Sequence, residues 1–164
     1  MSSWLHQSPW SSAATHIVGE LVALNHARYM ESQSPLFWVR ALHIGRHLPP
    51  PDDARLVWAQ TCLADAISRL DALTHQPLEK EKHWDSIIEA LGFQMRPNHN
   101  PFRELGHTLQ RDEVYEAVLR HGKPLNGAFA SVARARGLTV TKVRDTYYDA
   151  RKRVAQLWKT VSVK

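Results

Sequence analysis

The stretch from Phe129 to Tyr148 reads FASVARARGLTVTKVRDTYY, and it predicts two helices joined by a tight turn. Such a pair needs a small residue where the helices cross and a turn residue that tolerates a positive φ. Ala133 and Gly137 stand where those two demands fall. We expect Leu138 to plug the turn as an apolar residue and the Thr139 hydroxyl to cap the second helix.

The spacing from Ala133 to Gly137 to Val143 resembles the helix-turn-helix pattern of bacterial and phage DNA-binding proteins. The resemblance is confined to Phe129 to Tyr148. It implies that the second helix enters the major groove of duplex DNA. Helical pairs joined through glycine also occur as plain αα-hairpins, so that alternative stays open.

Basic residues are concentrated toward the carboxyl end of the chain. From Arg120 to Lys164 there are 11 Lys and Arg against Asp145 and Asp149 alone, a net charge of +9. The preceding 119 residues hold 10 basic and 14 acidic residues, a net charge of −4. We therefore expect a polyanion, double-stranded DNA, to bind at one end of the molecule only.

The composition predicts a folded, cytoplasmic protein. Hydrophobic residues make up 43% of the 164-residue chain, which is enough to bury a core. There is no apolar run of the ~18 residues that a membrane span requires, so no membrane association is expected. The amino terminus lacks the basic and apolar regions of a secretion signal. Cys62 is the single cysteine, which fits a reducing compartment.

Apolar residues recur at spacings of three and four, which predicts an all-α fold. We expect an N-terminal four-helix bundle followed by a C-terminal trihelical helix-turn-helix unit with an extended last helix. The bundle helices are expected at about 12–31, 35–44, 52–73 and 78–91, and those of the trihelical unit at about 111–121, 127–136 and 139 onward. The predicted domains are an acidic bundle at 1–92, a linker at 93–110 with room for one short helix after Asn100-Pro101, and a basic DNA-binding domain at 111–164.

Two apolar stripes in the predicted bundle should face its core. The residues expected to point inward from the third and fourth helices are Leu56, Ala59, Leu63, Ala66, Ile67, Leu70 and Leu73, and Trp84, Ile87, Ile88 and Leu91.

The last helix is longer than a trihelical unit needs. Its apolar residues continue in a seven-residue repeat at Val140, Val143, Tyr147, Ala150, Val154, Leu157 and Val161. Its far half can pack against the chain's own bundle or pair with a second copy as a homodimer, and the small Ala150 favours the first.

Candidate DNA-contacting residues fall into two groups. The residues turned away from Val143 and Tyr147 near the start of the last helix are Thr141, Lys142, Arg144, Asp145 and Tyr148. The candidates for reading bases are Val140, Thr141, Lys142, Arg144 and Tyr148. Candidates for contacting phosphates without reading sequence are Lys123, Arg134, Arg136, Thr139, Arg151, Lys152 and Arg153. A phosphate contact, or a salt bridge to Asp145 or Asp149, is the alternative for Arg144, and a solvated charged face is the alternative for 151–153.

The sequence contains no pattern typical of an enzyme or a cofactor site. A phosphate-binding glycine loop, a dinucleotide fingerprint and a nucleophile elbow are all absent from it. The pair His43 and His47 lacks further ligands, so no metal or cofactor is predicted.

These observations favour a transcriptional regulator that binds DNA. The alternatives are a helical adaptor that binds a protein partner, and a nucleic-acid-binding protein without sequence preference, of the packaging or antitermination type. The predicted bundle would serve a homodimer contact, a protein partner or a ligand.

Overall fold

The computed structural model describes residues 12–46, 48, 52–75, 83–93, 101–121 and 125–161, and every regular element within them is a helix. These elements are α1 (Ser12–Ser32), α2 (Pro35–Gly45), the 3-10 turn η1 (Asp52–Leu56), α3 (Val57–Thr74), α4 (His83–Ala90), α5 (Pro101–His121), α6 (Leu125–Arg136) and α7 (Val140–Val161). The predicted all-α class is confirmed. None of the described helices combines the length and the apolar run that crossing a bilayer requires.

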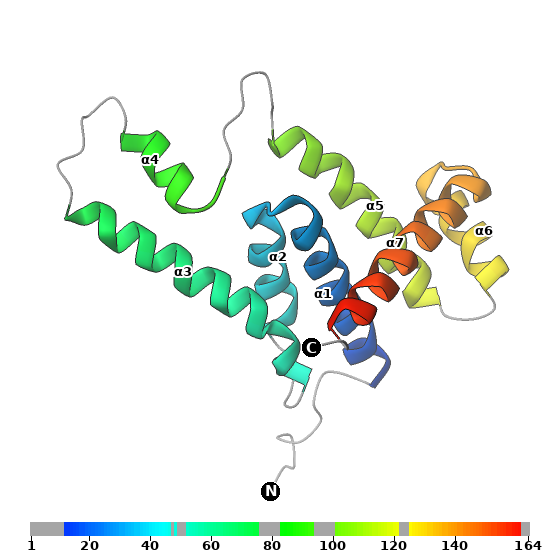
Figure 1. Ribbon diagram of the computed structural model, residues 1–164. Helices are drawn as coiled ribbons and strands as arrows, with labels where there is room; N and C mark the ends of the chain where they lie inside the picture. The colour runs from blue at the N-terminus through cyan, green and yellow to red at the C-terminus, as the bar shows by residue number, and fades with distance from the viewer. Residues whose placement is uncertain are drawn as a thin grey trace, which may run out of the picture.

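Helix α1 lies between α2 and α3 on one side and α5 and α7 on the other (Figure 1), and it contributes to both hydrophobic cores of the described residues. Leu21, Leu24 and Ala27 join the larger core with α5, α6 and α7. Val18 and Val22 join the smaller core with α2, η1 and α3. The residues from 17 to 27, IVGELVALNHA, are apolar almost all round the helix, as a helix covered on two sides requires.

Packing is therefore shared across the boundary that the sequence predicted between 1–92 and 111–164. Helix α1 contributes to the same core as the carboxyl-terminal helices. The predicted linker at 93–110 is helical from Pro101 onward. Proline is well tolerated at a helix start because its missing N–H would have no partner there. The extra helical turns lie beside α1, where the Arg28 side chain donates to the backbone carbonyl of Thr108 at 3.4 Å.

The far half of α7 packs within its own chain. Ala150, Val154 and Leu157 are buried in the larger core with α1. The sequence left two alternatives for this half, packing against the chain's own helices or pairing with a second copy. The structure shows the first. Val140 and Val161, at the two ends of the heptad stripe, are each 47% exposed.

Helices α3 and α4 leave several apolar side chains in solvent. Helix α3 runs outward from the centre of the molecule (Figure 1), and its buried face carries Ala59 and Ala66. Leu63 is 38% exposed, Ile67 is 56% exposed and Trp84 is 72% exposed. The prediction that these three point inward is wrong. The apolar stripe of α3 is wider than the surface that packs against it, and Trp84 of α4 lies on an exposed side of its helix.

Candidate nucleic-acid interface

The turn between α6 and α7 is built around Gly137. Its φ is +62°, in the left-handed region that favours glycine. The N–H of Leu138 donates to the carbonyl of Ala133 at 2.9 Å, which is the six-to-one bond of a Schellman motif. Leu138 itself is 40% exposed, so the prediction that it plugs the turn as a buried residue is wrong.

Thr139 caps helix α7 as the sequence predicted. Its hydroxyl oxygen accepts from the N–H of Lys142 at 3.2 Å, and its carbonyl accepts from the N–H of Val143 at 3.1 Å. The first bond satisfies an amide group that has no backbone partner within the helix, and the second is the first backbone hydrogen bond of the helix. The glycine turn and the cap together set where α7 begins and in which direction it runs.

The first half of α7 is held by an aromatic core. Tyr147 lies between Tyr115 of α5 and Phe129 of α6, with ring centroids 5.5 Å away in each case. Val143 is fully buried one turn earlier. Helices α5, α6 and α7 pack against one another in the larger core.

The base-reading candidates lie on the exposed side of α7. Val140, Thr141, Lys142, Arg144 and Tyr148 are all exposed. Tyr148 is 53% exposed, yet the edge of its ring meets Phe129 with centroids 6.1 Å apart. The Arg144 Nε lies 3.9 Å from an oxygen of Asp145, at the outer limit of an ion pair. Arg144 is therefore free to reach outward.

The phosphate-contact candidates do not share one environment. Arg134 and Lys152 are exposed and have no ion pair with any described carboxylate. Arg136 pairs with Glu113 at 2.7 Å, with both side chains exposed. Thr139 is exposed at the amino end of α7. Lys123 lies outside the described residues.

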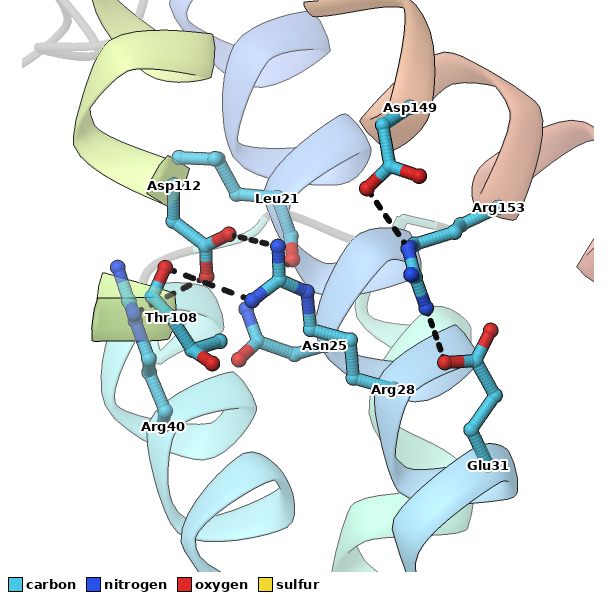
Figure 2. A network of polar contacts seen from close by, with 9 residues as sticks. All are labelled: Leu21, Asn25, Arg28, Glu31, Arg40, Thr108, Asp112, Asp149 and Arg153. Atoms are coloured by element: carbon cyan, nitrogen blue, oxygen red, sulfur yellow. Dashed lines mark hydrogen bonds and ion pairs between the residues drawn. The ribbon is translucent and has the colours of Figure 1, made fainter. Parts of the chain in front are cut away.

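Arg151 and Arg153 are tied to α1. Arg151 donates to Glu20 at 3.1 Å, and the Tyr115 hydroxyl donates to the same carboxylate at 2.9 Å. Burial, and then the charge of Glu20, raises the pKa of Tyr115, so the phenol stays protonated and remains a donor. Arg153 lies between Glu31 and Asp149 (Figure 2). These two arginines hold α7 against α1, a role that the sequence reasoning missed.

A buried ion-pair cluster joins α1, α2 and α5 (Figure 2). Asp112 of α5 has a side chain that is only 1% exposed, and its oxygens lie 2.6 Å from Arg28 Nη2 and 3.1 Å from Arg40 Nη1. Burial raises the pKa of Asp112, while the two guanidinium groups oppose that shift. The sequence held one signal of this cluster. Arg28 follows Leu24 and Ala27 on the apolar part of α1, and a cation in such a position needs a buried acidic partner.

The described residues show no other arrangement that suggests chemistry. No three His, Cys, Asp or Glu side chains in this part of the chain gather as a metal site would require. Comparisons with protein-family models, with curated proteins and with solved structures find no match to this chain.

Proposed function

We propose that this protein binds duplex DNA in a sequence-specific manner through α6 and α7, and that it acts as a transcriptional regulator. The observation that carries the proposal is the exposed amino-terminal part of α7, fixed in place by the Gly137 turn and the Thr139 cap. In helix-turn-helix proteins this part of the second helix enters the major groove. The net charge of +9 from residue 120 onward suits a polyanionic partner.

The exposed side chains have distinct roles in this proposal. Arg144 donates two hydrogen bonds to a guanine edge, and the methyl groups of Val140 and Thr141 contact a thymine methyl. Lys142 and Tyr148 extend the same surface toward neighbouring bases or the backbone.

Phosphate contacts are made mainly by Arg134 and Lys152, which have no described carboxylate partner. Arg136 can exchange its exposed pair with Glu113 for a phosphate, because such surface pairs contribute only about 0–1 kcal/mol. Arg151 and Arg153 act by holding α7 against α1 instead.

The experiment is selection of bound sequences from a pool of random duplexes, followed by affinity measurements on the selected duplex at several salt concentrations. We expect a defined motif for the wild type and its loss in Arg144→Ala. Arg120→Ala is the matched control, because Arg120 is an exposed arginine paired with Glu116 on α5 and it removes the same charge. The control should lower affinity at most uniformly across sequences. Binding without any enriched motif, falling steeply with salt, would contradict sequence reading and favour a packaging or antitermination role.

A second candidate function, binding of a protein partner, is favoured by the exposed apolar residues of α3. Val57 and Ile67 are each 56% exposed and Leu63 is 38% exposed, more apolar surface than one helix of a monomer needs to show. The predicted homodimer is the simplest form of this function. Light scattering of the wild type and of Ile67→Glu over a range of concentrations tests it. A dimer in the wild type that the variant loses would support the homodimer, and a monomer at all concentrations would exclude the homodimer on this face.

A further inference from the structure

Asp145 is an acidic residue on a surface that otherwise suits DNA. Within α6 and α7, the acidic residues are Asp145 and Asp149. Asp149 is paired with Arg153, whose Nε donates to it at 3.0 Å. Asp145 has a side chain that is 67% exposed, and the cation nearest to it among the described ion pairs, Arg144, is 3.9 Å away. Asp145 is therefore the less compensated carboxylate of this pair of helices.

The stability of α7 does not explain this carboxylate. Favourable interaction with the helix dipole is confined to the first turn, and Asp145 lies beyond it. Asp149 stands four residues further along, so the two like charges repel one another on the helix surface. Next to a polyanion the same charge opposes binding in general. Asp145 is thus unfavourable both for the helix, through repulsion from Asp149, and for DNA binding in general. A role in choosing between DNA sequences accounts for its presence on this surface.

The position of Asp145 suits contact with a base. It lies four residues after Thr141 and three before Tyr148, so the three side chains form one ridge on the helix. All three are exposed, while Val143 and Tyr147 on the opposite side are buried. Asp145 is thus part of the same outward face as the base-reading candidates.

The chemistry of a carboxylate limits which base it tolerates. An ionised Asp only accepts hydrogen bonds. In the major groove guanine presents two acceptors, thymine presents an acceptor and a methyl group, and adenine presents a donor beside an acceptor. Cytosine presents a donor, its N4 amino group, without a neighbouring acceptor. A carboxylate in the groove therefore accepts a hydrogen bond from the N4 amino group of cytosine and is repelled by the acceptors of guanine and thymine. At adenine it meets a donor at N6 but also the repelling acceptor N7, so cytosine is favoured.

We propose that Asp145 is a specificity-determining residue that selects cytosine at one position of the bound duplex. This inference rests on the proposed function of α7. Asp145 contributes discrimination by repelling acceptor-bearing bases, while Arg144 beside it contributes attraction to guanine. The expected discrimination at that position is about 5- to 150-fold between cytosine and the other bases, the range of one good base contact.

The test compares the motifs selected from random duplexes by the wild type, Asp145→Asn and Asp149→Asn. An amide can bond both the N6 donor and the N7 acceptor of adenine, so Asp145→Asn should change one position of the motif from cytosine to adenine. Asp149→Asn removes the same charge one turn away and should leave the motif unchanged. Both variants should bind nonspecific duplex more tightly at low salt, because each removes a negative charge.

The possible outcomes separate the two proposals. A wild-type motif that Asp145→Asn leaves unchanged, or that both variants alter alike, would overturn the role of Asp145 and leave the proposed function standing. No motif for the wild type would overturn the proposed function, and the role of Asp145 with it.

Discussion

Replacing Asp112 by alanine should destabilise the protein far more than replacing its neighbour Glu113. The Asp112 side chain is 1% exposed and lies between Arg28 and Arg40, whose side chains are 9% and 20% exposed. Asp112→Ala leaves these two cations without their carboxylate. Removing one partner of a buried ion pair costs about 3–5 kcal/mol. For a chain of this size that corresponds to a fall in Tm of roughly 6 to 20 °C.

Glu113→Ala is the matched control on the same helix. Glu113 also pairs with an arginine, Arg136, at 2.7 Å, but the two side chains are 52% and 42% exposed. Such a surface pair contributes about 0–1 kcal/mol. Urea denaturation followed by circular dichroism measures the free energy of unfolding of both variants. An Asp112→Ala cost within about 1 kcal/mol of the control would refute the conclusion that this cluster fastens α5 to α1 and α2.

A triple variant separates two causes of the destabilisation by Asp112→Ala. One is the burial of unpaired cations, and the other is the loss of any net stabilisation that the intact cluster provides. Arg28→Met, Arg40→Met and Asp112→Leu together replace the whole cluster with apolar side chains. Arg28 Nε has no hydrogen-bond partner among the described residues, so the cluster is incompletely satisfied. Replacing such a cluster as a whole is often neutral or stabilising. We expect the triple variant to be more stable than Asp112→Ala.

Two further predictions concern the turn and the smaller core. Gly137→Ala should cost about 1–2 kcal/mol in the same urea assay, because φ is +62° there and a Cβ is strained in that region. Gly127→Ala, in helix α6 with no atom within 4 Å of the added Cβ, should instead stabilise by about 0.4–1 kcal/mol, and equal effects of the two would contradict this account. His26 stacks on Trp58 with ring centroids 4.3 Å apart, and burial lowers the pKa of His26 from its ordinary value of 6.5. The folded state then binds fewer protons, so the free energy of unfolding should fall as pH decreases below about 6.5. His26→Phe keeps a stacked ring and should lose this component of the pH dependence, whereas an unchanged pH profile would show that His26 does not cause it.

The local structure of this chain follows closely from its sequence. Pro35 at a helix start, Gly137 at a helix end and Thr139 at a helix cap act within one or two turns, so their effects are readable without the fold. The repeat from Val143 to Leu157 likewise identifies the buried side of α7. The turn geometry and the exposed face of the candidate interface were predictable for this reason.

The arrangement of the helices was less predictable. Helix α1 is apolar on two sides, and periodicity cannot say which helix covers each side. A short helix after Asn100-Pro101 was expected, but its continuation into one helix from Pro101 to His121 was not, because the segment is rich in turn residues and Gly106 lies inside the helix. The exposure of Ile67 depends on how much of α3 the neighbouring helices cover, which is a property of the fold. The pairing of Arg153 with Glu31 joins residues far apart in the chain and has no local signal.

Mapping of backbone amide chemical shifts during titration with the selected duplex tests the central claim most directly. If the outward face of α7 binds DNA, the largest changes should fall between Thr139 and Tyr148, with smaller changes near Arg134. Helix α3 (Val57–Thr74), which lies on the other side of α1 from α6 (Figure 1), should be unaffected. Changes concentrated on α3 and α4, with α7 unaffected, would contradict the assignment of α7 as the helix that reads DNA.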